Sequence, residues 1–347
     1  MATMLTSNVG FSADINAAIG KFDRPIRMII EEETNLCRKK NQFDRLIYNV
    51  ANSDKFSEAY FVENELGMLK AVAEGAAGDD LSSKEVGKKF IDHTEFKGDS
   101  LINRTLIEDS NRNEISKRVR KLIRSYWSTR NKFAQAGLYS GTAATMTFAG
   151  KSFDLTTADG LSLFNKEHKW GTGTDTQSNY RYYLTENAVD ASMMAELMAA
   201  MAVAGRQLKS ESGDPLGYTF NKIFVPGNRY ALESSVRKVI GTQYSPGDDK
   251  NDINIMHGGW QLVVLPNWES ESDVFIVGSD ESNENNSGSM FYDRMPFDVQ
   301  RSDQFDREDN LVLHGRARMS LVHNGYKHYQ MCKIVKTAAS DSTAITL

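Results

Sequence analysis

The strongest local pattern in the chain is the stretch NEISKRVRKLIRSYWSTRNKFAQAG, residues 113–137. Apolar side chains recur in it at intervals of three, four and seven residues, the spacing of one face of an α-helix. The residues on this face are Ile115, Val119, Leu122, Ile123, Tyr126, Trp127 and Phe133. Asn111 and Glu114 are spaced as a capping box, and Gly137 is typical of a helix end. The pattern predicts a helix about 37 Å long, roughly twice the average length, packed lengthwise against another element.

The opposite side of this predicted helix is basic. Its cations are Lys117, Arg118, Arg120, Lys121, Arg124, Arg130 and Lys132. Such a row can follow the phosphates of a nucleic acid, face solvent, or pair with acidic side chains of a neighbouring segment. Acidic runs at residues 31–33 and 303–309 are candidates for that pairing, which is the interpretation we favour.

Composition excludes several classes of protein. The chain has 347 residues, enough for two domains or one elaborate domain. Its 41 Lys and Arg against 46 Asp and Glu give a net charge of −5, too small to mark the whole chain as nucleic-acid-binding. Two cysteines cannot form a disulfide framework or a four-cysteine zinc site. With no membrane-length apolar run and no secretory signal, we expect a reduced, soluble, cytoplasmic protein.

The residues before the long helix predict extensions rather than a core. Residues 1–55 carry helical spacing from about Pro25, and they predict either a surface helix pair or an arm that packs on a neighbouring subunit. Residues 56–108 are polar and glycine-rich, and MLKAVAEGAAGDDLSSKEVGKKFIDHTEF (68–96) is typical of two strands about a turn at 78–80. Because an isolated hairpin is marginal in water, we expect a protruding hairpin that finds its partner elsewhere.

The residues after the long helix alternate between helices and strands. The predicted elements are a helix from Glu186, capped by Thr185, to Ala204; a strand from Lys222 to Val225; a helix capped by Asn228 and ended by Gly241; strands at 260–265 and 273–277; and strands at 311–323 and 326–335. Asn324-Gly325 between the last two strands is the strongest short hairpin signal, because both turn positions need φ above zero. These elements predict an α+β fold with mostly antiparallel strands.

Side chains that could carry chemistry are scattered. The sequence contains no phosphate-binding loop, dinucleotide fingerprint or nucleophile elbow. His323, His328 and Cys332 lie near one another in the sequence, but successive positions on a strand face spread apart, so we interpret the histidines as structural. His168 and Cys37 receive the same interpretation. We therefore predict no catalytic residue, no cofactor, no metal site and no enzymatic activity.

The order of these elements resembles that of tailed-phage major capsid proteins, in particular the branch of Mu-like major head subunits. The segment DGLSLFNKEH, residues 159–168, is similar to the Asp-Gly-x-x-Leu-Phe-x-x-x-His segment that follows the spine helix in that branch. Further similar segments are GTGTDTQSN (171–179), FNKIFVPGNRYALESSVRKVI (220–240), GGWQLVVLPNW (258–268) and the strand at 316–319. The likeness covers most of residues 56–335.

The resemblance implies the Hong-Kong-ninety-seven capsid fold. The implied parts are an N-terminal arm at 1–55, an extended loop at 56–108, a peripheral domain at 109–219 and 296–347 with the spine helix 113–137, and an axial domain at 220–295. The implied function is that of a major capsid protein of a tailed bacteriophage, which assembles through pentamers and hexamers into an icosahedral shell in the host cytoplasm. Double-stranded DNA in weak, non-specific contact and separate scaffolding, portal and decoration proteins are the implied partners. The alternatives are an encapsulin-like nanocompartment, a soluble nucleic-acid-binding protein that uses the basic helix, and an unrecognised hydrolase.

Three groups of residues are candidates for assembly contacts if the resemblance holds. Arg120 and Arg124 would pair with carboxylates of the arm or of a neighbouring extended loop. Asp248, Asp249 and Asp252 would crowd together at a symmetry axis, where like charges repel by roughly 1 kcal/mol per pair even in bulk water. Lys84, Lys88 and Lys89 lie in the extended loop. Some family members cross-link subunits through a Lys–Asn isopeptide bond, but no spacing here singles out such a pair, so that chemistry is not carried over.

Overall fold

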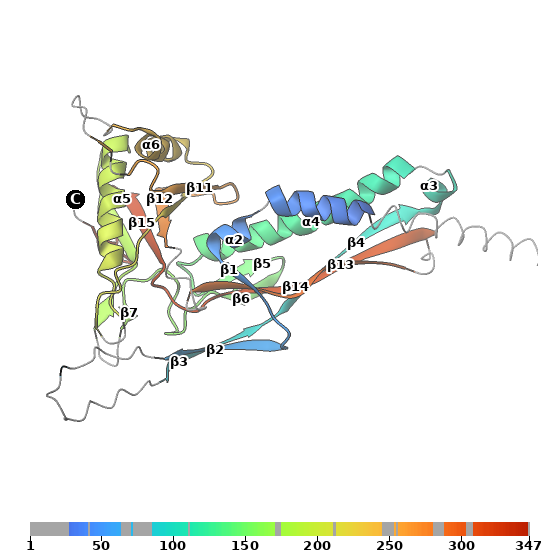
Figure 1. The fold of residues 1–347 in the computed structure, drawn as a ribbon, viewed down its shortest axis with the longest axis horizontal. Coiled ribbons are helices and arrows are strands. Elements are labelled where there is room, and N and C mark those ends of the chain that lie inside the picture. The colour runs from blue at the N-terminus through green and yellow to red at the C-terminus, as the bar shows by residue number, and fades with distance from the viewer. Residues whose placement is uncertain are drawn as a thin grey trace, which may run out of the picture.

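The computed structural model describes residues 28–40, 42–63, 71, 85–109, 112–170, 175–210, 213–244, 253–254, 256–279, 288–302 and 308–345. The molecule is elongated (Figure 1). A long helix runs beside a four-stranded sheet along most of its length, and a second body with a six-stranded sheet and two helices stands at one end. The mixture of helices and sheets confirms the predicted α+β class. No helix in the described ranges is long and apolar enough to cross a bilayer.

The long helix is α4, Arg112–Tyr139, which confirms the predicted spine helix. Ile115, Val119, Ile123 and Trp127 of this helix are buried against strands of the same chain. The helix continues two residues past Gly137, so the predicted stop is wrong. A Cβ at this position would lie against the Tyr48 hydroxyl and 2.8 Å from a methyl group of Leu321, so glycine is required there for close packing. The predicted cap at Asn111 lies outside the described residues.

The four-stranded sheet lies along α4. Its order is β1 (Asn49–Asn52), β13 (Ser289–Arg301), β14 (Asn310–His323) and β4 (Thr94–Asn103). β1 pairs with β13 in parallel, and the other pairs are antiparallel. The short helix α3 (Arg104–Glu108) connects β4 to the start of α4. Residues 94–108 are therefore part of the body, and the predicted protruding segment 56–108 is too long at its C-terminal end.

The six-stranded sheet belongs to the second body. Its order is β11 (Gln261–Leu265), β10 (Lys222–Pro226), β12 (Asp273–Gly278), β15 (Tyr329–Val335), β9 (Tyr180–Leu184) and β16 (Thr343–Ala344). Helices α5 (Ala191–Arg206) and α6 (Tyr230–Gly241) pack on it through a second hydrophobic cluster. The segment 220–295, for which an axial domain is predicted, contains β10, β11 and β12 of this sheet; β9, β15 and β16 lie outside it, and the start of β13 belongs to the four-stranded sheet.

Two helix starts differ from the prediction. α5 begins at Ala191 because the Asp190 side chain caps it, accepting a hydrogen bond from the Met193 backbone N–H at 2.8 Å. Thr185 instead accepts from the Asn187 backbone N–H in the preceding turn. α6 begins at Tyr230, and the Asn228 side chain, predicted to cap it, is hydrogen-bonded to Ser270.

The predicted hairpin at Asn324-Gly325 is wrong. β14 pairs with β13 and β4, whereas β15 pairs with β12 and β9 in the other sheet. Neither Asn324 nor Gly325 has a positive φ, so the turn that the dipeptide favours does not form. Asn324 is buried where the chain passes from one sheet to the other.

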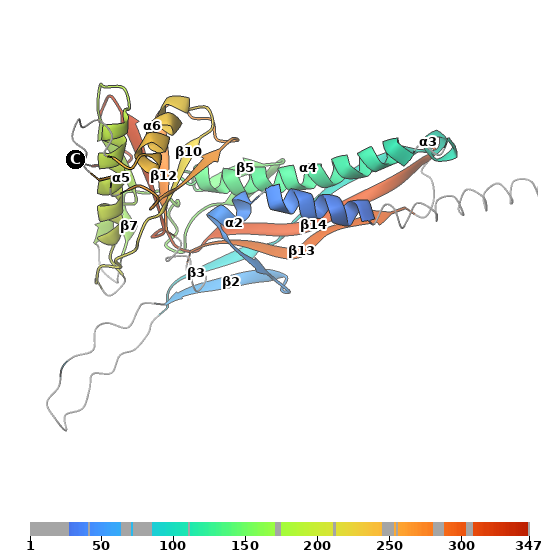
Figure 2. The same cartoon turned by 45° about the horizontal axis from the view of Figure 1, so that its top comes forward.

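The remaining described segments form an arm and small hairpins. Residues 28–40 are helical and lie beside α4, and α2 (Phe43–Ile47) follows (Figures 1 and 2). β2 (Ser57–Glu63) pairs with β3 (Glu85–Asp92), so the first strand of the extended hairpin precedes the predicted stretch 68–96, and the predicted turn lies outside the described residues. Two further hairpins are β5 (Thr145–Phe148) with β6 (Lys151–Asp154), and β7 (His168–Lys169) with β8 (Thr176–Gln177).

Candidate assembly sites

Ion pairs connect the arm to the spine helix. Arg124 Nε lies 2.5 Å from Glu33 Oε1, and Arg120 lies 3.7 Å from Glu33 and 3.8 Å from Glu32. Glu33 is buried in the arm helix, whereas Arg120 is half-buried and Arg124 is exposed. The expected pairing of Arg120 and Arg124 with carboxylates of the arm is therefore present within one chain. Their role in assembly stays a prediction.

A second group of charges lies deeper, around Arg130. Its Nε donates to Asp44 Oδ2 at 2.7 Å and its Nη2 to Asp293 Oδ2 at 2.8 Å, while its guanidinium carbon lies 4.4 Å from the centre of the Phe291 ring. Burial alone would lower the pKa of Arg130, but its hydrogen bonds to Asp293 and the charges around it raise the pKa, so the side chain stays charged. This buried cation joins α2, α4 and β13.

The sequence places Arg130 on the basic face by its residue type alone. Its position, three residues after the buried Trp127, was the available signal that it lies on the packed side.

Four of the seven cations of the basic face form ion pairs within the chain, namely Lys117, Arg120, Arg124 and Arg130. Lys117 pairs with Glu114 at 2.6 Å, and Arg118 donates to the Leu101 carbonyl oxygen. Within the described ranges, Lys121 and Lys132 are the cations of this face with exposed side chains and no ion pair. The row of cations that would follow phosphates is thus much shorter than the sequence suggests.

The β2–β3 hairpin has two different faces. Register places Phe61 opposite Lys88 and Ala59 opposite Phe90, so these four side chains share one face. That face is open, with Phe61 50 % and Phe90 61 % exposed. Lys89, on the other face, is buried and forms an ion pair with Asp154. Of the three predicted lysines, Lys88 is therefore accessible, Lys89 is enclosed, and Lys84 lies outside the described residues.

The acidic loop predicted at a symmetry axis, with Asp248, Asp249 and Asp252, lies outside the described residues. A bridge between Tyr244 and Ile253 brings the flanks of this loop together just after α6. Both flanking side chains are exposed.

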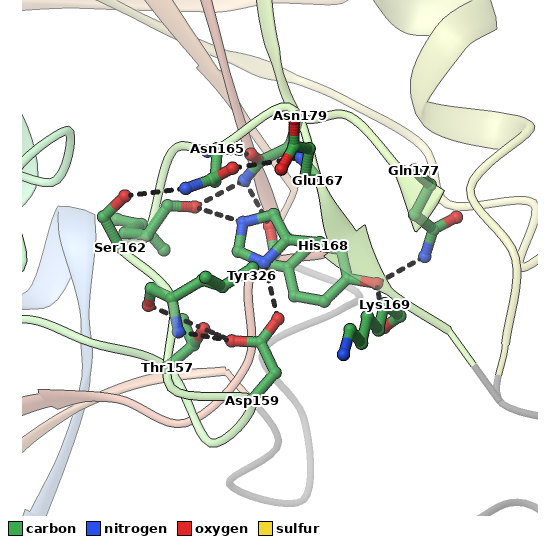
Figure 3. Close-up of polar contacts among 12 residues, drawn as sticks. Thr157, Asp159, Ser162, Asn165, Glu167, His168, Lys169, Gln177, Asn179 and Tyr326 are labelled. Atoms are coloured by element: carbon green, nitrogen blue, oxygen red, sulfur yellow. Dashed lines mark hydrogen bonds and ion pairs between the residues drawn. The ribbon is translucent and has the colours of Figure 1, made fainter. Parts of the chain in front are cut away.

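The segment Asp159–His168 forms a polar cluster around the buried side chain of His168 (Figure 3). His168 Nδ1 lies 2.7 Å from Asp159 Oδ2 and its Nε2 lies 3.2 Å from the Leu163 carbonyl oxygen. Burial alone would raise the pKa of Asp159, but hydrogen bonds, first among them that from His168, lower it. Both ring nitrogens therefore face an oxygen acceptor, which fixes the orientation of the imidazole.

The same cluster connects distant segments. The His168 ring stacks on Tyr326 at 3.8 Å between centroids. The Tyr326 hydroxyl accepts from Gln177 Nε2 at 2.5 Å and donates to the Lys169 carbonyl oxygen at 3.3 Å. Asn179 donates to the carbonyl oxygens of Leu163 and Tyr326. These contacts fasten the segment after β6 to the crossover between β14 and β15, and His168 takes part in this connection.

The other histidines and cysteines that the sequence analysis names are also buried. His323 Nδ1 accepts from the Ser289 hydroxyl at 2.7 Å, its Nε2 donates to the Gly137 carbonyl oxygen at 3.1 Å, and burial lowers its pKa to about 4. Burial lowers the pKa of His328 to about 3 and raises that of Cys332 to about 12. Burial likewise raises the pKa of Cys37. In the part of the chain that the structure describes, no three His, Cys, Asp or Glu side chains converge on a possible metal position.

The fold is similar to solved capsid structures. The capsid of the native GTA particle has a TM-score of 0.51 at 13 % identity, covering 84 % of this chain and 89 % of that chain. The capsid of Myoviridae phage XM1 has a TM-score of 0.51 at 11 % identity, covering 85 % and 92 %. A chain of Mycobacterium phage Patience has a TM-score of 0.50 at 12 % identity, covering 94 % and 90 %. No family model and no curated protein matches the chain. The likeness shows the fold, which is the Hong-Kong-ninety-seven capsid fold.

Proposed function

We propose that this chain is the major capsid protein of a tailed bacteriophage. The observation that carries the proposal is the similarity to capsid chains, which spans 84 % or more of this chain and 89 % or more of each of the three chains compared. Because the match extends over most of the chain, few residues lie outside the capsid fold to form an additional domain with another activity. The protein would act as a structural subunit of the virion rather than as an enzyme.

The shape of the subunit supports assembly into a homo-oligomeric shell. The β2–β3 hairpin extends from the body (Figure 2), and its residues Phe61 and Phe90 are exposed. Monomeric soluble proteins rarely expose a contiguous apolar surface of this kind. In the shell, the four-stranded sheet with α4 would form the peripheral domain and the six-stranded sheet with α5 and α6 the axial domain. Phe61 and Phe90 would meet a neighbouring subunit within a pentamer or hexamer.

Contact with packaged DNA would be weak and non-specific. The spine-helix cations are mostly paired within the chain, so few are left to release counterions from phosphates. Separate scaffolding, portal and decoration proteins would complete the particle.

Electron microscopy of the purified full-length chain tests the proposal. We expect closed shells or tubes, and a small monodisperse species would contradict it. The double variant Phe61→Ser, Phe90→Ser should keep the wild-type unfolding temperature, because both side chains are already exposed, yet should fail to close shells. Nuclease-protected double-stranded DNA in particles from the natural source would support a phage head over an encapsulin-like compartment.

A further inference from the structure

The β2–β3 hairpin is joined to the body through very little backbone. It forms a separate two-stranded sheet, whereas β1 before it and β4 after it belong to the four-stranded sheet. A single residue, His93, separates β3 from β4. Backbone pairing therefore does not fix the direction in which the hairpin leaves the body, and side-chain contacts must do so.

The inward face of the hairpin supplies one such contact through Lys89. Its ammonium forms an ion pair with Asp154, at the end of β6, and donates to the Thr156 hydroxyl at 2.7 Å. Asp154 is itself held in place, because its Oδ1 accepts from the Thr156 backbone N–H at 2.8 Å. The acceptor is thus already positioned when the lysine arrives.

The burial of Lys89 makes its position depend on the ion pair with Asp154. The Lys89 side chain is 8 % exposed, whereas Asp154 is 56 % exposed. An ammonium that is removed from water is costly unless it is paired, so Lys89 is stable inside only while Asp154 receives it. The hydrogen bonds from Lys89 and Thr156 offset burial and lower the pKa of Asp154, which keeps the partner ionised. Nearby, Lys151 of β6 donates to the Thr94 hydroxyl at 2.9 Å, which attaches the β5–β6 hairpin to the start of β4 in the body.

We propose that Lys89 is a latch that docks the hairpin on its own subunit through the β5–β6 hairpin. The Lys89–Asp154 ion pair holds the inward face of the hairpin against the body. The opposite face, with Phe61 and Phe90, is thereby directed away from the body before any neighbouring subunit binds. Release of the ion pair would loosen the outer part of the hairpin. Its base stays attached, because Ile91 packs on Met290, Tyr292 and Val322 and His93 is hydrogen-bonded to Ser53 and Ser320. This inference concerns the single chain and stands whether or not the chain assembles into shells.

Hydrogen–deuterium exchange of the full-length chain tests the latch. An undocked two-stranded hairpin is marginal in water, so its own amides should open more often. We expect Lys89→Gln and Asp154→Asn each to accelerate exchange across residues 57–63 and 85–92 by about tenfold. Lys88→Gln is the matched control, since it removes the same charge one residue away on the open face, and it should exchange as the wild type does.

Three outcomes would overturn the proposal. Wild-type exchange in either Lys89→Gln or Asp154→Asn would show that the pair does not hold the hairpin. Equal acceleration in Lys88→Gln would show that charge on the strand matters rather than the contact. Acceleration that extends through α4, or loss of the fold, would show that Lys89 supports the whole body and not the docking of the hairpin.

Discussion

Replacing Arg130 by methionine removes the charge that joins α2, α4 and β13 while keeping a long apolar stem. Asp44 and Asp293 then lose their common cation, and the Asp44 side chain is as deeply buried as that of Arg130. Breaking a buried ion pair by removing one partner costs about 3–5 kcal/mol, because the remaining charge is left uncompensated. With two carboxylates stranded, we expect the free energy of unfolding to fall by about 4–5 kcal/mol.

Urea unfolding of the full-length chain, followed by circular dichroism, measures this loss. Lys132→Met is the matched control, because Lys132 is exposed on the same helix, and its effect should stay within about 0.5 kcal/mol. Adding Asp44→Asn and Asp293→Asn to Arg130→Met should recover more than half of the loss, since the stranded charges are then gone. A loss below about 1 kcal/mol, or no recovery in the triple variant, would refute the reasoning.

Three further predictions concern the core, pH and the arm. Trp127→Ala should lower the free energy of unfolding by about 3–5 kcal/mol, and unchanged thermal stability would remove Trp127 from the core. His323 is neutral in the fold because burial lowers its pKa to about 4, but it titrates near 6.5 when unfolded. The unfolded chain therefore binds more protons as pH falls, so stability should drop from about pH 6.5 to 4 by up to about 3 kcal/mol, and His323→Gln should lose that part of the pH dependence. The double variant Arg120→Glu, Arg124→Glu should detach the arm helix, which faster amide exchange at residues 28–40 would show, and should impair assembly before it impairs folding. The control Lys121→Glu should change neither property. Normal empty shells that fail to retain DNA would instead show that this face contacts the genome.

The long helix could be predicted because its signal is local. The apolar spacing along α4 can be read from residues that are close in the sequence. The same spacing indicates which face of the helix is buried, and Ile115, Val119 and Ile123 lie on that face. The strands β10, β11 and β12 were also placed within one or two residues. The pairing of strands could not be predicted in the same way, because partners such as β4 and β14 are separated by about two hundred residues.

The incorrect predictions share a physical cause, because in each case tertiary contacts override a local conformational preference. Asn324-Gly325 favours a tight turn, but the chain gains more by burying Asn324 and passing to the second sheet. Gly137 favours a helix end, but the close approach of Tyr48 and Leu321 requires glycine inside the helix. Among the candidate site residues, Lys88 and Lys89 looked equivalent until β3 placed them on opposite faces. Only the register of that strand, which residue types do not reveal, separates them.

The two faces of β3 also constrain how the hairpin can change over evolution. Inserting one residue between Phe90 and His93 would turn over the part of β3 that precedes the insertion, so that Phe90 would point toward the body and Lys89 away from it, whereas inserting two would preserve both faces. The register already shifts between Val62 and Glu63, opposite the stretch from Gly87 to Glu85, which places an odd residue beyond the docked part of the strand. Related chains should therefore vary in the docked part of this strand by even numbers of residues, and should confine odd insertions and deletions to the stretch beyond it.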